Sequence, residues 1–316
     1  GTTTHGRRCH NAASLFVFHS MMEDATDIFS RLQPRLLGAA YRMLGSMAEA
    51  EDVVQDTWLR WHGADQSEVD NAEAWLIATT TRRAIDRLRS AHHNREQYVG
   101  IWLPEPVLTE EPTTPEQVNE VSNDLSIAFL TVLERLGPEA RAAFLLHEVF
   151  DEDYAQIASA LGKSEAACRQ IVHRAKHQLM QDRKRYIVSR DDHQRLMRRF
   201  AEALARGDIT GMKDMLAESA VLVGDGGGVV TSFPKPMMGG ERIAHLLFAP
   251  TLRPENGVRI ELAQINGELG VLRYLHGRLE SAQSYVSDGR HISHIYVQRN
   301  PEKLRRIAAH AATRVQ

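Results

Sequence analysis

Residues 49–61 read EAEDVVQDTWLRW and predict a helix with a single buried face. Its apolar and small residues recur at the spacing of one continuous helical stripe. These residues are Ala50, Val53, Val54, Thr57, Trp58 and Trp61. The rest of the surface is polar, and its acids are concentrated in the N-terminal turns, where they favour the positive end of the helix dipole. By itself the pattern fits two structures: a surface helix with a solvated acidic face, or one that presents this face to a partner.

Composition limits the classes of protein. A length of 316 residues allows two or three domains, and 43% hydrophobic with 25% charged residues is ordinary for a soluble globular chain. The net charge of −3 carries no overall nucleic-acid signature, so any DNA contact must come from local clusters. Cys9 and Cys168 are too few for a disulfide framework or a four-cysteine zinc site, which favours a reducing, cytoplasmic setting.

The chain start does not resemble a membrane span. No apolar run approaches the roughly 20 residues that a spanning helix requires. Residues 1–22 contain two arginines and then a short apolar run, without the small-residue cleavage site of a signal peptide. We therefore expect residues 1–22 to be an upstream extension or an expression remnant.

Breaker residues divide the remainder. Residues 23–95 are predicted to be helical, with a break at Gly45-Ser46. Residues 96–119 form a linker, because Pro104, Pro106, Pro112 and Pro115 exclude regular structure. This linker contains WLPEPV, and Trp102 is expected to pack on another surface. Residues 120–187 return to a helical pattern.

Residues 188–316 begin with a helix and continue with strands. Asn266-Gly267 and Asp288-Gly289 each separate two strand-like segments and favour tight hairpin turns. Helices followed by a hairpin-rich sheet predict an α+β domain.

Residues 154–179 predict a helix-turn-helix. A short helix ends at Gly162, Ser164 caps the next helix, and Glu165 lies in its first turn. Ala167, Ile171, Ala175 and Leu179 are predicted to face inward. The outward residues are Arg169, Gln170, His173, Arg174 and Lys176, and residues 163–185 carry seven Lys or Arg against two acids. The alternative is a helical hairpin whose basic face has no ligand.

These two segments resemble regions 2 and 4 of a bacterial sigma factor. Residues 35–45, RLLGAAYRMLG, and residues 136–144, LGPEARAAF, match the entrances to the two regions. A short linker without an intervening region 3 is the extracytoplasmic-function layout. The resemblance implies core RNA polymerase and promoter DNA as partners. The implied core-binding residues are Glu51, Asp52, Gln55 and Asp56. Those for the −10 element are Trp75, Arg82, Arg83, Arg87 and Arg89, although Trp75 fits a core position better than a base-stacking one. Those for the −35 element are Ser164, Glu165, Arg169, Gln170, His173, Arg174 and Lys176.

Residues 188–316 resemble a SnoaL-like domain, a relative of ketosteroid isomerase. Sigma factors with this fusion share WLPEP, DGGGK and NPDKL motifs, and this chain has WLPEP, DGGG and NPEKL. Val229 stands where the subgroup has lysine, and Glu302 where it usually has aspartate. The resemblance implies an inter-domain regulatory set comprising Trp102, Leu103, Pro104, Glu105, Pro106, Asp225, Gly226, Gly227, Gly228, Asn300, Pro301, Lys303 and Leu304.

Catalytic and metal sites are not expected. Asp225, His276, His291 and His294 are the candidates for a general base. However, Asp225 is expected to end a strand and order the glycine loop, and His291 and His294 are expected on opposite strand faces. His173 and His177 have a helical ligand spacing but lack the HExxH acid. No cofactor is predicted, and a small-molecule ligand in the cone remains open.

The predicted fold is therefore two all-α sigma domains, a region 2 bundle and a region 4 helix-turn-helix, followed by an α+β SnoaL-like cone. The predicted function is that of an alternative sigma factor regulated by its own C-terminal domain. The alternatives are a ligand-responsive helix-turn-helix regulator and a SnoaL-type isomerase or cyclase tethered to DNA-binding helices. The first leaves the acidic helix unexplained, and co-purification with core polymerase distinguishes it. Turnover that Asp225→Asn abolishes would identify the second.

Overall fold

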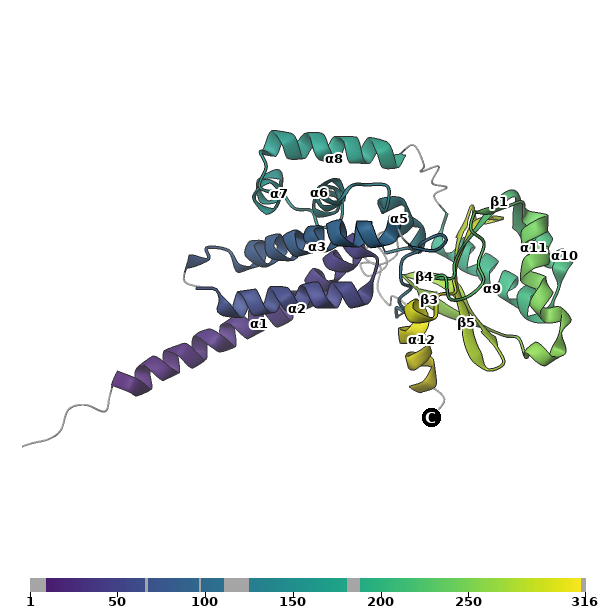
Figure 1. The fold of residues 1–316 in the computed structure, drawn as a ribbon, viewed down its shortest axis with the longest axis horizontal. Helices are drawn as coiled ribbons and strands as arrows, with labels where there is room; N and C mark the ends of the chain where they lie inside the picture. Colours follow the sequence, from purple (N-terminus) through teal and green to yellow (C-terminus); the bar gives the residue numbers. More distant parts are fainter. Residues whose placement is uncertain (1–9, 66–67, 97, 111–124, 181–187, 314–316) are drawn as a thin grey trace, which may run out of the picture.

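The computed structural model describes residues 10–65, 68–96, 98–110, 125–180 and 188–313. Within these ranges the chain has a helical half and a sheet-containing half (Figure 1). The part of the linker around residues 98–110 runs between the two halves. Cys9, Pro112 and Pro115, which the sequence analysis singled out, lie outside the described residues.

The first bundle contains α1 (His10–Leu44), α2 (Met47–Gly63) and α3 (Ala72–Glu96). Gly45 ends α1 with φ +65°, and the Ser46 side chain caps α2 by accepting from the Glu49 amide. The predicted stripe of α2 is confirmed, since Ala50, Val53, Val54, Thr57 and Trp61 are buried and Trp58 packs on Phe29. Helix α1 begins at His10, so it includes residues that the sequence analysis assigned to the extension.

The second helical unit contains α5 (Ile127–Leu133), α6 (Pro138–Glu148), α7 (Tyr154–Leu161) and α8 (Glu165–Met180). Gly162 adopts φ +63°, and Ser164 Oγ accepts from the Ala167 amide at 3.2 Å, as a helix-turn-helix requires. The predicted inward stripe of α8 was partly wrong. Cys168 and Val172 are buried with Ala175 and Leu179, whereas Ala167 and Ile171 are only half-buried. Helix α8 packs on α6 as well as α7, which rotates its buried face by one position.

The C-terminal half is a mixed sheet with helices on both faces. It contains α9 (Arg190–Arg206), α10 (Ile209–Met215), β1 (Leu216–Asp225), β2 (Met237–Met238), α11 (Gly240–Phe248), η2 (Ala249–Leu252), η3 (Pro254–Asn256), β3 (Arg259–Ile265), β4 (Glu268–Leu275), β5 (Arg278–Ser287), β6 (Ile292–Gln298) and α12 (Pro301–Thr313). The strand order is β2-β1-β6-β5-β4-β3, with β1 parallel to β6 and the other neighbours antiparallel.

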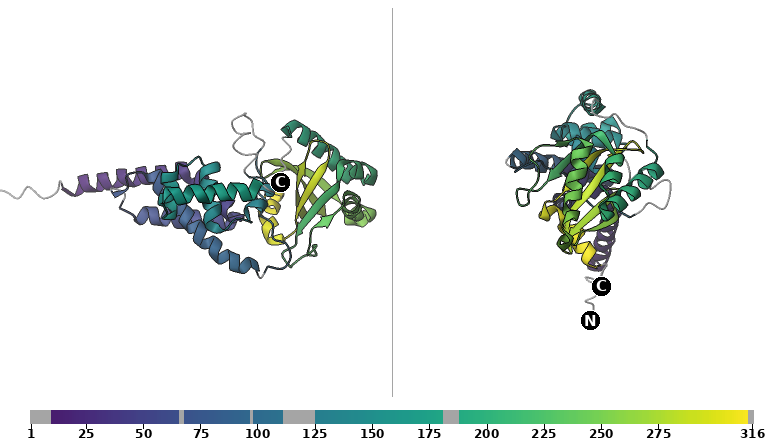
Figure 2. Two further views of the ribbon diagram at one scale, coloured as in Figure 1. Left: turned by 90° about the horizontal axis from the view of Figure 1, so that it is seen from above. Right: turned by 90° about the vertical axis from the view of Figure 1, so that its right-hand side faces the viewer.

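The core of this half lies inside the curved sheet. Residues of α9, α10 and α11 pack on the inner face, and Phe200 of α9 meets Tyr285 of β5 edge-on. On the outer face, Leu304 and Ile307 of α12 pack against Leu272 and Ala282. The predicted α+β cone is thus confirmed, and Figure 2 shows α12 between its sheet and the helical half.

Of the two predicted hairpin turns, one is confirmed and the other is longer than expected. Asn266 and Gly267 join β3 and β4 with φ +52° and +81°, as predicted. The Asp288-Gly289 connection is longer, because β6 begins at Ile292. His291 therefore lies in the turn, and the prediction that it lies on a strand face was wrong.

A third hairpin was missed by sequence reasoning. His276 and Gly277 join β4 and β5 with φ +51° and +73°. A glycine between two alternating segments was the available signal. Among the helices of the described residues, none has the length and apolar content to cross a membrane.

Candidate functional sites

The acidic face of α2 is exposed but already engaged in ion pairs. Asp56 pairs with Arg83 at 3.4 Å, and Asp52 pairs with Arg87 at 3.6 Å, both across to α3. Glu51 instead binds Arg306 of α12 through two hydrogen bonds, at 2.9 and 2.6 Å. Two parallel hydrogen bonds between one guanidinium and one carboxylate form a bidentate ion pair, which is stronger than a pair with a single hydrogen bond. The C-terminal domain therefore touches one end of the predicted core-binding face, while Gln55 is exposed.

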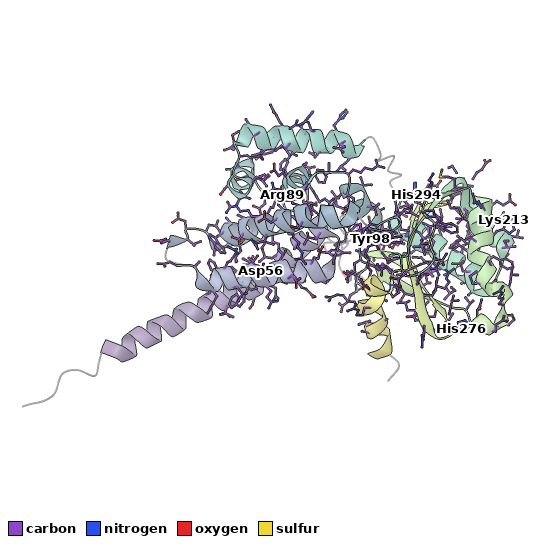
Figure 3. All side chains as sticks on the ribbon, in the orientation of Figure 1. Asp56, Arg89, Tyr98, Lys213, His276 and His294 are labelled. Carbon is purple, nitrogen blue, oxygen red and sulfur yellow. The ribbon has the colours of Figure 1, made fainter. Side chains whose placement is uncertain are left out.

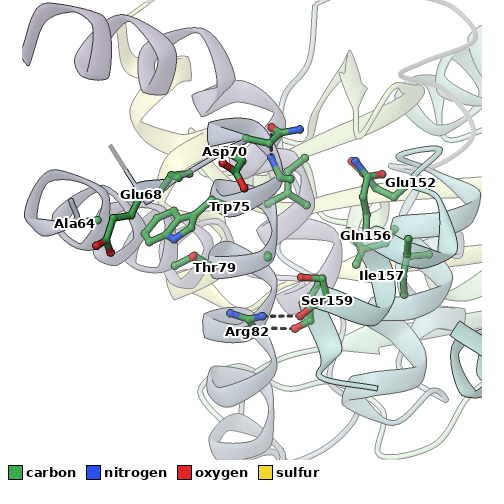
Figure 4. A pocket seen from close by; sticks show the side chains of 18 of the residues that line it. Ala64, Glu68, Asp70, Trp75, Thr79, Arg82, Glu152, Gln156, Ile157 and Ser159 are labelled. Carbon is green, nitrogen blue, oxygen red and sulfur yellow. Dashed lines mark hydrogen bonds between the residues drawn. The ribbon is translucent and has the colours of Figure 1, made fainter. Parts of the chain in front are cut away.

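Arginines of α3 hold the two helical units together. Arg82 donates from Nε to the Ala160 carbonyl at 2.9 Å and from a terminal nitrogen to the Ser159 carbonyl at 2.6 Å (Figure 4). These carbonyls lie at the C-terminal end of α7, which favours a cation. Arg89 pairs with Glu139 of α6 at 2.7 Å. Lys163 also binds Glu139, and this hydrogen bond, with the charges of Lys163 and Arg89, holds the pKa of the Glu139 carboxyl below its usual value.

A cavity of about 580 Å³ separates α3 from α7 beside this contact. Trp75 lies at its wall, half-buried, with its ring centroid 5.4 Å from that of Trp61 (Figure 4). Glu68, Asp70 and Glu152 also line the cavity. Of the predicted −10 residues, Trp75 and Arg82 line this cavity, whereas Arg83, Arg87 and Arg89 do not. Figure 3 marks Asp56 and Arg89 on the helical half.

The outer face of α8 is largely unobstructed. Gln170, His173 and Arg174 are exposed, as the predicted recognition face requires. Arg169 pairs with Glu165 at 2.9 Å and lies over the Tyr154 ring at 5.0 Å. Lys176 pairs with Glu148 of α6 at 2.7 Å, so it faces the support helix more than the solvent.

Asp225 is the centre of the inter-domain contacts. Its side chain is fully buried at the end of β1. Within the described part of the chain, one oxygen accepts from the Tyr98 hydroxyl at 2.6 Å and the Gly227 amide at 2.9 Å. The other accepts from Leu103 N at 2.9 Å, Gln298 Nε2 at 3.1 Å and Lys303 Nζ at 2.7 Å. One carboxylate therefore joins the linker, the glycine loop, β6 and α12.

Glu105 connects the linker to α2. Its carboxylate accepts from the Met47 amide at 2.8 Å and from Ser46 Oγ at 3.2 Å, at the N-terminus of the helix. Arg306 lies 3.3 Å from the other oxygen. Because a carboxylate satisfies free amides at a helix start, this buried glutamate acts as a second cap on α2.

Tyr41 extends the same junction. Its hydroxyl donates to the Glu105 carbonyl at 2.6 Å and accepts from Asn266 Nδ2 at 2.7 Å. Asn266 Oδ1 in turn accepts from the Val107 amide at 2.9 Å. Pro104 and Pro106 are buried in this junction. The hairpin turn between β3 and β4 is therefore joined to both the linker and α1.

Trp102 packs as the sequence predicts. A Cβ on Gly45 would lie 2.6 Å from its ring, so the glycine permits the close approach. Lys303 Nζ lies 4.2 Å from the ring centroid on another side, in cation–π geometry. Trp102 thus contacts α12 and the end of α1 together.

The loop at residues 225–228 requires glycine, because a side chain at Gly227 or Gly228 would clash with its neighbours. Gly227 has φ +64°, and a Cβ there would lie 2.3 Å from Asn300 Nδ2. Asn300 donates to the Tyr98 hydroxyl at 2.9 Å and accepts from the Glu302 amide at 3.0 Å. Gly228 approaches Val99 in the same way, whereas Val229, at the subgroup's lysine position, is 69% exposed. Gly226 is buried, Pro301 is exposed, and Leu304 packs under the sheet.

Several residues of this junction were missed. They are Tyr41, Tyr98, Val99, Asn266 and Arg306. The aromatic and apolar Tyr98 and Val99, immediately before the linker motif, gave a usable signal; the others become partners only through the tertiary fold. Burial and the neighbouring Asp225 carboxylate raise the pKa of the Tyr98 phenol, which keeps its donor proton.

The general-base candidates do not form a group. Asp225 is occupied by the linker, and His276 lies in an exposed turn. His294 is half-buried on β6, where burial lowers its pKa, and Figure 3 shows it well separated from His276. Among the described residues, no cluster of three His, Cys, Asp or Glu side chains is placed to hold a metal ion.

Comparisons with known proteins agree with this architecture. The family model for sigma-70 region 2 matches residues 28–94, and that for sigma-70 region 4 matches residues 126–179. The ECF RNA polymerase sigma factor SigJ of Mycobacterium tuberculosis H37Rv is 36% identical over 248 residues, which cover 77% of this chain and 78% of the relative. The probable ECF sigma factor SigI of the same strain is 33% identical over 57% of this chain and 63% of its own length.

A solved structure matches both halves. The crystal structure of Mycobacterium tuberculosis SigJ superposes with a TM-score of 0.69 at 31% identity, over 89% of this chain and 98% of that one. A match of this extent includes the sheet-containing half as well as the helices.

Replacement of Asp225 by asparagine tests the junction. The substitution keeps the shape of the side chain but removes the negative charge beside the Lys303 ammonium and turns an amide toward hydrogen-bond donors. We expect a loss of about 3–5 kcal/mol in unfolding free energy, as for other broken buried charge pairs. Urea denaturation of the full chain measures it. Glu241→Gln breaks an exposed pair with Lys213 and is the control, expected to be silent. Equal midpoints for the two variants would contradict the assignment.

Proposed function

The chain belongs to the ECF RNA polymerase sigma factors, and on this premise we propose that its C-terminal cone controls promoter binding by holding the two sigma domains closed. In this proposal the acidic face of α2 binds core RNA polymerase, α3 reads the −10 element and α8 reads the −35 element. The polymerase performs the chemistry, and the chain itself catalyses nothing. Because its partners are polymerase and promoter DNA, its place of action is the cytoplasm.

The observation that carries the proposal is the use of recognition residues as internal contacts. Arg82 and Arg89, which the sequence predicts to contact the −10 element, bind α7 and α6, and Glu51 binds Arg306 of α12. Arg83 and Arg87 pair with the acids of α2. The arrangement therefore describes a closed state, in which promoter opening and full access to the core-binding face require these pairs to exchange.

The linker supplies the means of control. It is fastened to α2 through Glu105 and to the cone through Asp225, so the cone sets where the linker leaves region 2. Both promoter elements must be reached at once, which makes this separation decisive. Surface ion pairs such as Arg89–Glu139 contribute little each, so opening depends on separating the apolar core that the two helical units share.

The two alternatives are less well supported. A stand-alone regulator leaves the acidic face of α2 without a purpose. A tethered isomerase needs a free base, whereas the Asp225 carboxylate is occupied by donors from the linker, the glycine loop, β6 and α12.

Core binding is tested with Asp52→Ala combined with Asp56→Ala. These side chains are exposed, so folding is retained, while the loss of two charges should weaken binding to core polymerase roughly tenfold. Fluorescence anisotropy with labelled sigma factor gives the affinity. Glu218→Ala with Glu255→Ala, two exposed acids of the cone, forms the matched control. Unchanged affinity in the α2 double variant would remove this face from the interface.

Promoter reading is tested with Arg169→Ala and Arg174→Ala in the polymerase holoenzyme. Arg169→Ala should cost about 1–3 kcal/mol at one base position of the −35 element and relax the preference there. Arg174→Ala should weaken all promoter variants alike and reduce the salt dependence, as loss of a phosphate contact does. Binding to a set of singly substituted promoters measures both. A uniform loss after Arg169→Ala would argue against a base contact.

Control through the linker is tested with Trp102→Ala. The substitution removes the ring between Gly45 and Lys303, so the linker should detach from the cone and the two sigma domains should separate further. We expect transcription from the cognate promoter to change at least about fivefold, equivalent to roughly 1 kcal/mol. Distance labels on α3 and α8 report the separation, and Met238→Ala, exposed on β2, is the control. Unchanged distance and unchanged transcript yield together would leave the cone a passive fusion.

A further inference from the structure

The cone contains a cavity of about 490 Å³ on the inner side of its sheet. It lies between α11 with η2 and η3 on one side and strands β1, β4, β5 and β6 on the other. Its volume is within the range of small-molecule sites, roughly 300–1,000 Å³. The cavity is separate from the junction that holds the linker, because Asp225 is not among its lining residues.

Most of its wall is apolar. Leucine side chains come from both the helical and the strand side, together with an aromatic ring near the opening. These residues are Leu222, Leu246, Leu247, Leu252, Leu275 and Phe233. Such a wall favours a hydrocarbon body and offers little to a fully polar ligand.

The charged residues that line the cavity carry a net positive charge. Its lining contains Arg253, Arg273 and Arg299 against one acid, Glu280, a difference of +2. Glu280 binds Arg273 Nε at 2.8 Å and Arg299 Nε at 2.6 Å. Burial of Glu280 opposes its ionisation, but the adjacent Arg273 and Arg299 outweigh this and lower the pKa of the carboxyl.

Arg273 has N–H donors at its terminal nitrogens that are available to a ligand. Its side chain is 10% exposed, and among the described residues its hydrogen bonding runs through Nε to Glu280. A guanidinium carries five N–H donors, and its terminal pair matches a carboxylate in a bidentate geometry. Arg299 is engaged at a terminal nitrogen, which donates to the Thr231 carbonyl. Arg273 is thus the natural anchor for an added anion.

We infer that this cavity binds a small amphipathic organic anion, with its carboxylate on Arg273 and its apolar body among the leucines. The excess positive charge selects the head group, and the apolar wall selects the body. Neither a neutral hydrocarbon nor a free inorganic anion satisfies both parts of the lining.

The cavity and the docked linker lie on opposite faces of β1 and β6. Successive residues of these strands face one and then the other. Leu222 and Gly224 of β1 line the cavity, and Asp225 follows at the strand end with its carboxylate on the linker. Val297 of β6 and Arg299 just after it line the cavity, whereas Gln298 between them donates toward the Leu103 and Pro104 carbonyls. A ligand in the cavity therefore meets residues of β1 and β6 whose sequence neighbours, on the opposite face of these strands, hold the linker.

The test uses anilinonaphthalene sulfonate, which is an anion with an apolar body, and its neutral analogue N-phenylnaphthylamine. The full-length protein is titrated with each probe, and octanoate and octanol are compared as competitors. We expect the sulfonate probe to bind and octanoate to displace it at least about tenfold more effectively than octanol, as the loss of a charge-assisted bidentate contact requires.

Two variants locate the site. Arg273→Met keeps the length of the side chain and leaves Glu280 paired with Arg299, so the fold is retained; it should weaken the sulfonate probe and octanoate about tenfold and leave the neutral probe unchanged. Arg278→Met, an exposed arginine at the start of β5, is the matched control and should bind as the parent does. Leu246→Trp fills the cavity from its half-buried wall and should abolish binding of both probes.

Two results would overturn the inference. One is equal affinity of octanoate for the parent and Arg273→Met; the other is equal displacement by octanoate and octanol. Unchanged binding of both probes in Leu246→Trp would likewise place them elsewhere on the protein and reject this cavity as the site.

Discussion

The buried carboxylate of Asp225 is the interaction on which the arrangement of the chain depends. A charge removed from water is costly unless donors replace its hydration. Here the donors come from Tyr98 and Leu103 of the linker segment, Gly227 of the loop, Gln298 of β6 and Lys303 of α12. These segments are far apart in sequence, so the carboxylate is satisfied only when the cone is folded and the linker is docked. That condition couples the fold of one domain to the position of another.

The second fixed point is at α2. Glu105 supplies acceptors to the start of this helix, and Arg306 spans from Glu105 to Glu51 on the next turn. Helix α12 thus contacts the linker, the sheet and the acidic face together (Figure 1). Because one helix makes all three contacts, movement of the cone relative to the linker also changes access to the acidic face.

The junction differs in character from the contact between the two helical units. The junction is buried and built on hydrogen bonds to charged groups, which are strong and geometrically demanding. The contact between the helical units combines exposed arginines, such as Arg82 and Arg89, with a buried part. Apolar residues of both units form one core, and the buried Arg141 of α6 donates to the Met43 carbonyl of α1 at 2.7 Å. Screening by water and salt weakens exposed pairs. Salt and water therefore weaken the exposed pairs of the helical contact more than the buried bonds of the junction.

The sequence by itself determined the local elements and their order. Periodicity located the buried stripe of α2, Gly162 and Ser164 marked the turn of the helix-turn-helix, and Asn266-Gly267 marked a hairpin, because each depends on neighbouring residues alone. The tertiary structure decided which surfaces meet. The stripe of α8 shifted because α6 packs on it. Arg82 found carbonyls of α7, and Tyr41, Asn266 and Arg306 joined the linker, although nothing in their local sequence marks them. Such contacts arise between residues up to 255 positions apart, as for Glu51 and Arg306. Their formation depends on the path of the whole chain, which no spacing rule within a helix or strand contains.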